Sequence, residues 1–539
     1  MIERVRRVAV IGAGVSGVTT AVHLQAEGLN VTVFERAPVA GGVWVLDPRT
    51  PHEPTFPSTK PSLADSVFYN SIENEDPYLL HAPPGPAYET LTNNVATQFL
   101  ELSVNSWPAG TPAFVKHNVI AEYIQDTSIK TGIHERTLYN TRVKNLSKEG
   151  NIWRLETSTW NKTTGKATEK VWEFELVVVA SGRECLLKLL SIVSQDFNRF
   201  HFQAIYEFCA SAGAYPDSRF YIPEFLFRSV FPLTINIEKS TDYHAPRVPD
   251  IPGLAEWKEA WPSRIQHSKS YRNPNGFEDQ TIFLIGGSAS SIDIAREVGP
   301  VAKRVYQSTR GGFMDTPESW LPPNGTRVPG IASFGELDDE PSVAAGAIPG
   351  KVVLVDGRVL EDIDRVIVAT GYHFTLPFLP RDFHRDDVPR EEADGKVLVT
   401  DGTMLHNLHK DIFYIPDPSL AFTGVPFYTA TFSLFEFQAI AIAAVFSGQA
   451  QMPTWDEMTA QYKERIKEKG HGKPFHTLVG QDVQYAKGLM EWVNLGRDPS
   501  TKKVDGYSAE WIAAREEFIK TFWERGSKEN KSTAEEFTA

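Results

Sequence analysis

Three glycines and one acid near the N-terminus have the spacing of a nucleotide-binding turn. Gly12, Gly14 and Gly17 follow an apolar run in RVAVIGAGVSG, and Glu35 ends a second apolar run 23 residues after Gly12. The first glycine allows a tight bend, the second lets pyrophosphate approach the backbone, and the third lets a helix pack on its strand. A carboxylate at this distance accepts hydrogen bonds from ribose hydroxyls. The predicted dinucleotide contacts are Gly12, Gly14, Ser16, Gly17, Glu35 and Arg36.

The same arrangement recurs in TIFLIGGSASSIDIAR (281–296), where Ser288 replaces the second glycine. Counting 23 residues from Gly286 leads to Thr309, beside Arg310, so this position lacks a carboxylate. An acid would repel a 2′-phosphate, whereas hydroxyls and a guanidinium bind one, and we therefore expect NADPH rather than NADH here. The alternative is that Arg310 is an ordinary solvated surface residue. The predicted contacts are Gly286, Ser288, Ser290, Ser291, Ser308, Thr309 and Arg310.

Parallel strands and following helices must position both turns, which predicts an α/β fold with two Rossmann-like units. The acid in the first unit favours FAD there, and its absence favours a nicotinamide nucleotide in the second. Two further apolar strands, VVVASG (177–182) and DRVIVATGY (364–372), end in small residues that let the backbone pass close to a cofactor. Thr370 and Gly371 are therefore further candidate contacts.

Composition excludes several function classes. The net charge of -14 argues against a nucleic-acid partner, which needs clustered cations. The most apolar window, AIAIAAVF (439–446), is far shorter than the roughly 20 residues that cross a bilayer. Cys185 and Cys209 form neither a C-x-x-C pair nor a zinc-ligand spacing, so we expect no metal site. We expect an acidic, soluble, cytoplasmic protein without a membrane or targeting segment.

Beyond the glycine turns, the chain resembles the flavin-containing monooxygenases, particularly the soluble fungal type that oxygenates sulfur or nitrogen. The segment APVAGGVW (37–44) is similar to the second flavin glycine turn of that family, with Gly42, Val43 and Trp44 as contacts. YETLTNN (88–94) resembles its Leu-x-Thr-Asn motif. The resemblance implies that Thr92 contacts the flavin and that Asn93 faces its ring.

Two more segments carry the resemblance. WPSRIQHSKSY (261–271) is similar to the family fingerprint, matching its histidine, serine and tyrosine at His267, Ser268 and Tyr271. Related Baeyer–Villiger enzymes end this fingerprint in Trp-Pro, whereas Tyr271-Arg272 favours heteroatom oxygenation. LAFTGVPFYTATFSLFEFQA (420–439) resembles the segment that closes over the flavin, which implies that Glu436 contacts the cofactor.

The resemblance implies a reaction. NADPH reduces FAD, O2 adds to the reduced ring as a C4a-hydroperoxide, and a small-molecule sulfur or nitrogen takes the distal oxygen, with Asn93 as the catalytic amide. A role in secondary metabolism fits this class. Two alternatives remain open: ketone oxygenation of the Baeyer–Villiger type, and a non-catalytic flavoprotein. Homodimer formation also remains open.

One stretch, residues 184–241, interrupts the resemblance. The continuation expected directly after the strand ending at Gly182 is found as YHAPRVPDIPG, at residues 243–253. Codons for Arg183 to Cys185 can contain an intron's 5′ signal, GTGAGT, and codons for Thr241-Asp242 can contain its 3′ CAG. We therefore interpret 184–241 as translated intron sequence. The alternative is a real insertion of this lineage.

These observations predict a domain order. Residues 1–182 and 351–450 would form the FAD domain, and residues 247–350 an NADPH domain inserted into it. Residues 451–539 would form a helical C-terminal extension. Within it, AEWIAAREEFIKTFWERG (509–526) has apolar residues at helical spacing and should pack on the body.

Overall fold

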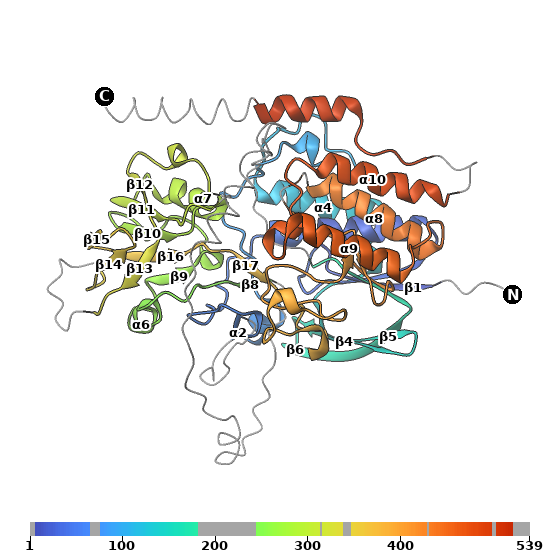
Figure 1. The fold of residues 1–539 in the computed structure, drawn as a ribbon, viewed down its shortest axis with the longest axis horizontal. Helices are drawn as coiled ribbons and strands as arrows, with labels where there is room; N and C mark the ends of the chain where they lie inside the picture. Colours follow the sequence, from blue (N-terminus) through green and yellow to red (C-terminus); the bar gives the residue numbers. More distant parts are fainter. Residues whose placement is uncertain are drawn as a thin grey trace, which may run out of the picture.

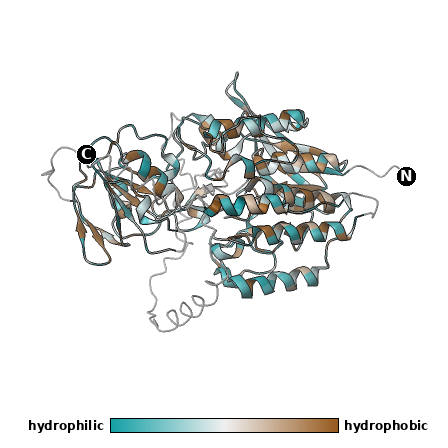
Figure 2. Cartoon of the chain, turned by 90° about the horizontal axis from the view of Figure 1, so that it is seen from above, coloured by the Kyte–Doolittle hydropathy of each residue, from teal (hydrophilic) through white to brown (hydrophobic). Residues whose placement is uncertain are grey.

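The computed structural model describes residues 6–64, 76–181, 244–312, 315–337, 347–427, 429, 431–497 and 503–520. The anomalous segment 184–241 lies outside the described residues. The described chain forms two lobes, each built around its own sheet, with the pair β8 and β17 between them (Figure 1). In Figure 2 the apolar residues concentrate in the strands inside each lobe, and polar residues cover the outer helices.

The larger lobe contains a seven-stranded sheet whose central strands are parallel. Its spatial order is β18 (Leu408–His409), β19 (Phe413–Tyr414), β20 (Leu420–Phe422), β7 (Leu176–Val179), β1 (Arg7–Ile11), β2 (Asn30–Phe34) and β3 (Thr137–Leu138). Val10 of β1 lies opposite Val33 on one side and Val178 on the other. The strands are almost continuously apolar because both faces of this sheet are covered.

Alternate residues of β1 enter two different cores. Val8 and Val10 pack in one cluster with residues of the helices α1 (Val15–Ala26), α4 (His117–Lys130) and α8 (Thr431–Ser447). Ala9 and Ile11 pack in a second cluster under the antiparallel strands β4 (Thr141–Glu149), β5 (Ile152–Asn161) and β6 (Lys166–Phe174). This alternation follows the two-residue period of a strand, and it fixes α1 against the turn that carries the glycines.

The smaller lobe contains a five-stranded parallel sheet. Its order is β12 (Gly325–Val328), β11 (Arg304–Ser308), β10 (Thr281–Ile285), β16 (Arg365–Val368) and β9 (Ile265–His267). The helices α6 (Leu254–Ala260) and α7 (Ala289–Val298) and the antiparallel strands β13 (Ile331–Phe334), β14 (Val352–Leu354) and β15 (Val359–Leu360) complete it. The predicted boundary at residue 350 lies inside this lobe, because β16 pairs with β10.

Two connections join the lobes side by side. β8 (His244–Pro246) leads into the smaller lobe and β17 (Tyr372–Phe374) leads out of it, and the two strands pair antiparallel, with His373 opposite Ala245. The chain then returns to the sheet of the larger lobe through β18 to β20. The predicted α/β fold, with one nucleotide-binding unit inserted into the other, is therefore confirmed.

The C-terminal part is helical in the described residues. It contains α9 (Trp455–Lys469), α10 (Asp482–Leu495) and a helix over 509–520. Trp511 and Phe518 pack against Phe99, with ring centroids 5.5 and 5.3 Å apart. The predicted C-terminal helix thus packs on the larger lobe, as far as its described residues extend. Two short helices, α2 (Pro61–Ala64) and α3 (Pro77–His81), and short 3-10 turns complete the described chain.

The described residues contain neither a membrane-spanning helix nor a cluster of metal-ligating side chains. Among the described residues, no helix is long and apolar enough to cross a membrane. Within the same ranges, histidine, cysteine and acidic side chains form no group of three that could hold a metal ion.

Candidate functional site

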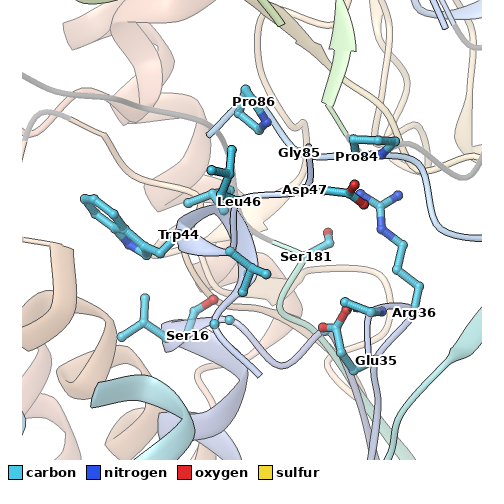
Figure 3. Close-up of a pocket in the computed structure, with 18 of the residues that line it drawn as sticks. Ser16, Glu35, Arg36, Trp44, Leu46, Asp47, Pro84, Gly85, Pro86 and Ser181 are labelled. Carbon is cyan, nitrogen blue, oxygen red and sulfur yellow. Dashed lines mark hydrogen bonds between the residues drawn. The ribbon is translucent and has the colours of Figure 1, made fainter. Parts of the chain in front are cut away.

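A cavity of about 420 Å³ opens at the carboxyl edge of the sheet in the larger lobe. It lies where β1, β2 and β7 end, which is the usual ligand position in an open α/β sheet. In Figure 3, Glu35 and Arg36 lie on one side of this pocket and Trp44 on the other. Ten predicted residues line it: Gly12, Gly14, Ser16, Glu35, Arg36, Gly42, Val43, Trp44, Thr92 and Asn93.

Each glycine of the first turn is required for a different structural reason. Gly12 has φ +103°, and a Cβ there would lie 2.8 Å from the carbonyl oxygen of Ala180. A Cβ on Gly17 would overlap the carbonyl oxygen of Gly12, so Gly17 serves the contact between helix and strand and does not line the cavity. Gly14 faces the turn that contains Gly42. A Cβ on Gly42 would lie 2.9 Å from the Cα of Gly14. The turns that contain Gly14 and Gly42 therefore touch each other at the cavity wall.

Glu35 is fixed by the backbone of both neighbouring turns. The carboxylate is 7% exposed and accepts hydrogen bonds from the N–H groups of Ala13 (2.7 Å) and Ala37 (2.8 Å). Burial raises the pKa of this carboxyl, and the two N–H donors act in the opposite direction. Each oxygen keeps acceptor capacity for a further hydroxyl, so the side chain can bind a ribose as predicted.

The cavity fits the phosphate-bearing part of FAD. Gly14 is the residue before α1 and offers no side chain to cap it, so the first N–H groups of the helix are available to an anion. Because Gly14 and Gly42 carry no side chains, the backbone at this contact stays accessible to pyrophosphate. Glu35 supplies the ribose acceptor, and Asn94, Leu100 and Phe435 are further lining residues that the flavin could contact.

The geometry does not support the predicted role of Asn93. Its amide donates to the carbonyl oxygens of Val95 (2.7 Å) and Ala113 (2.8 Å) and accepts from the N–H of Val115 (2.6 Å). Both N–H hydrogens are used, so none remains for the flavin ring. The next residue, Asn94, also lines the cavity and makes no hydrogen bond within the part of the chain that the structure describes. The second asparagine of the Thr-Asn-Asn sequence was the signal that the sequence interpretation missed.

Glu436 does not contact the cavity, which corrects the prediction for this residue. Its carboxylate accepts hydrogen bonds from Ser103 Oγ (2.7 Å) and Ser103 N (2.8 Å) and pairs with His23 Nε2 at 3.1 Å. These contacts join α8 to α1 and to the loop after residue 100. Other residues of the predicted closing segment, Pro426, Thr429 and Phe432, do line the cavity. The rotation of α8 on α1 decides which of its side chains reach the ligand.

The second glycine turn has the predicted backbone but a different set of side chains. Gly286 has φ +126°, and a Cβ there would overlap the carbonyl oxygen of Ala369. Ser288 precedes α7 and makes no capping bond with its side chain, which leaves the start of the helix available to phosphate. Ser290 lies half-buried in the first turn of that helix.

Two predicted contacts of the second unit point into its core. Ser291 is fully buried and accepts a hydrogen bond from Gln307 Nε2 (3.0 Å). Ser308, 3% exposed, donates to the carbonyl oxygen of Pro329 (2.9 Å). Ser291 connects α7 to β11, and Ser308 connects β11 to the residue after β12, so neither hydroxyl is free to bind a nucleotide in this arrangement.

Thr309 and Arg310 directly follow β11, at the carboxyl ends of the parallel strands of the same sheet. Arg310 is exposed and makes no hydrogen bond or ion pair with the described residues. Thr309 donates its hydroxyl hydrogen to the carboxylate of Asp315. Sequence spacing could not indicate Asp315, because it returns to the turn through a loop after β11.

Thr370 and Gly371 form the exit from the smaller lobe. Thr370 Oγ1 donates to the carbonyl oxygen of Arg247, and the N–H of Arg247 donates to the carbonyl oxygen of Gly371 (2.8 Å). Gly371 has φ +81°, which favours glycine. The guanidinium of Arg247 makes no hydrogen bond or ion pair in the described chain; burial lowers its pKa, and the nearby Arg310 acts in the same direction. No motif in the sequence indicated Arg247 as a candidate.

The fingerprint segment has a structural role beside this exit. His267 ends β9, is fully buried, and accepts a hydrogen bond from the N–H of Lys269 (3.2 Å). Burial lowers the pKa of His267 to about 3, so the ring is neutral. Arg272 donates to the carbonyl oxygens of Asp47 (3.0 Å) and Gly85 (3.1 Å), both of which lie on the cavity wall. This segment therefore attaches the smaller lobe to the flavin cavity.

Comparison with known proteins agrees with this geometry. Residues 7–44 match the family described as FAD dependent oxidoreductase, and residues 238–318 and 340–500 match the family described as Flavin-binding monooxygenase-like. The chain is 40% identical to the flavin-containing monooxygenase ustF2 of Aspergillus flavus, over 95% of this chain and 96% of the relative. It is 28% identical to iboF of Amanita muscaria, a protein of the same description, over 88% of this chain and 85% of the relative.

A solved structure shares the whole fold. The S-allyl-L-cysteine S-oxygenase of Allium sativum superposes with a TM-score of 0.63, at 22% identity, over 96% of this chain and 99% of that protein. The family predicts an enzyme that uses FAD, with NADPH as its usual nucleotide partner. The chain is a flavin-dependent monooxygenase and belongs to the flavin-containing monooxygenase family.

Proposed function

We propose that the protein uses NADPH and O2 to transfer one oxygen atom to a nucleophilic sulfur or nitrogen of a small molecule. The second oxygen atom leaves as water, and NADPH supplies the two electrons. When bound, FAD supplies the redox chemistry of this reaction, and the protein supplies position, shielding and hydrogen bonds.

The lining of the flavin cavity supports this proposal. Asn94 offers a neutral amide to this cavity, whose lining also includes the apolar side chains of Leu100, Phe432 and Phe435. Among the described lining residues there is no histidine and no cysteine. Such a lining provides a hydrogen bond and apolar contacts but no competing thiol or imidazole nucleophile, which suits oxygen transfer to a substrate that brings its own electron pair.

The remaining residues bind the two nucleotides. Glu35 accepts the ribose hydroxyls of FAD, and the first N–H groups of α1 bind its pyrophosphate. Arg310 and Arg247, which lack partners among the described residues, supply positive charge for the phosphates of NADPH. Asn94, rather than Asn93, donates a hydrogen bond at the flavin ring.

A product analysis with two probes tests the reaction. An aryl methyl sulfide and cyclohexanone would each be incubated with the FAD-loaded protein, NADPH and air. We expect one sulfoxide formed for each NADPH consumed with the sulfide, and no lactone with the ketone. Lactone as the main product would assign the alternative ketone reaction. NADPH left unoxidised with both probes and with amines would refute the proposal.

A further inference from the structure

The nucleotide turn of the smaller lobe carries an acid that its sequence spacing lacks. We propose that Asp315 is a specificity residue of the nicotinamide nucleotide site, which reduces the preference for a 2′-phosphate and lets the enzyme bind NADH as well as NADPH. This inference rests on the proposed function, because it requires the second turn to bind that nucleotide.

The carboxylate of Asp315 lies directly on the glycine turn. It accepts hydrogen bonds from Thr309 Oγ1 and from the N–H of Gly312 (2.9 Å). A Cβ built on Gly287 would overlap Asp315 Oδ1, so only a glycine allows this approach. The neighbouring residue fixes the loop, since Thr316 donates to the carbonyl oxygen of Gly287 from its N–H (2.8 Å) and its hydroxyl (3.2 Å).

The first glycine turn has an acid at the corresponding position. Glu35 accepts a hydrogen bond from Ala13, the residue between the first two motif positions. In the second turn, the residue between Gly286 and Ser288 is Gly287, and Asp315 lies against it. The two acids therefore occupy corresponding places, although one directly follows a strand and the other comes from a loop.

Charge then determines the nucleotide preference. A carboxylate beside the 2′ position accepts a hydrogen bond from a ribose hydroxyl but repels the dianionic 2′-phosphate. Arg310, exposed and without a partner in the described chain, attracts that phosphate. Because both charges border Thr309, the preference reflects their balance rather than Arg310 alone.

Equilibrium binding tests the inference without relying on turnover. The FAD-loaded protein and Asp315→Asn would be titrated calorimetrically with NADP⁺ and NAD⁺, and with 2′,5′-ADP and AMP to isolate the 2′-phosphate. We expect Asp315→Asn to raise the affinity ratio of NADP⁺ to NAD⁺ about tenfold, and the ratio of 2′,5′-ADP to AMP in the same direction. Glu318→Gln, which removes an exposed acid of the same loop, should leave both ratios unchanged.

Each other result has a defined meaning. If Asp315→Asn weakens or strengthens both nucleotides equally, the carboxylate only stabilises the loop and the inference fails. If Glu318→Gln shifts the ratios as much, a general charge effect explains them and the inference also fails. If the unsubstituted protein binds neither NADP⁺ nor NAD⁺, the proposed function itself is refuted.

Discussion

The two glycine turns share a backbone design but differ in how they are enclosed. In the first turn the acid is Glu35, which directly follows β2, and the turn that contains Gly42 lies against Gly14. In the second turn the acid is Asp315, which comes from a loop, and the neighbouring cation Arg310 is exposed. The first arrangement suits a cofactor that stays bound, and the second suits a nucleotide that enters and leaves.

The largest effect, a loss of bound FAD, should come from a substitution of Gly14 in the first glycine turn. Gly14 has φ -72°, and a Cβ there would meet only Gly42 Cα, at 3.6 Å, so valine fits the chain. Its branches would occupy the pyrophosphate position, and we expect Gly14→Val to purify without FAD, measured by the flavin absorbance. Ser288→Val, at the corresponding position of the second turn, should keep full flavin content and lose NADP⁺ affinity. Flavin loss in Ser288→Val alone would reverse our assignment of the two turns.

Lowering the pH should destabilise the larger lobe more strongly than the smaller lobe. Burial lowers the pKa of His406 to about 4 and of His409 to about 3 in that lobe, and that of His267 to about 3 in the smaller one. The unfolded chain takes up these protons near pH 6.5 while the folded protein does not, so stability is complete above that pH and falls below it. Each histidine contributes about 1.4 kcal/mol per pH unit in that window.

Thermal unfolding between pH 7.5 and 5.5, with FAD release monitored by fluorescence, measures this loss. His409→Gln should make the pH dependence shallower, because one of the histidines that resist protonation is removed. A melting temperature independent of pH across this range would contradict the assignment of neutral buried rings.

Removal of Arg310 should weaken the binding of NADP⁺ at the glycine turn of the smaller lobe. Arg310→Ala removes a charge-assisted hydrogen bond to the 2′-phosphate, worth about 1.5–3 kcal/mol, and should weaken NADP⁺ binding accordingly while NAD⁺ binding stays constant. Calorimetric titration measures both. Arg304→Ala, which removes an exposed cation at the start of β11, serves as the matched control. Equal NADP⁺ affinity in Arg310→Ala and the unsubstituted protein would make Arg310 an ordinary surface residue.

Substitutions of the neighbouring residues Asn93 and Asn94 should have different effects, the first on the stability of the protein and the second on its reaction. Asn93→Ala leaves the buried N–H of Val115 without its acceptor, and such a loss costs about 1–3 kcal/mol of unfolding free energy. Asn94→Ala should melt normally, since Asn94 bonds no described residue, but should release hydrogen peroxide while NADPH is consumed. A peroxide-selective electrode and thermal unfolding measure the two effects. Peroxide release confined to Asn93→Ala would restore the role first predicted for Asn93.

The sequence by itself determined the features that depend on local order. Each turn needs a strand, glycines and a helix in immediate succession, so both turns and Glu35 were predictable from short stretches. The insertion of one unit into the other was predictable because the family resemblance divides at the two connections. The FAD site follows from these elements, and ten of its predicted residues do line the cavity.

Only the tertiary structure decided which neighbouring side chain meets the ligand. Pairing with residues 113–115 turns Asn93 inward and leaves Asn94 at the cavity, and packing of α8 on α1 directs Glu436 to Ser103. A loop closure brings Asp315 to Gly287, which no spacing in the chain encodes. In each case the deciding contact joins residues distant in sequence, so it depends on how packed elements fit together rather than on local backbone preference.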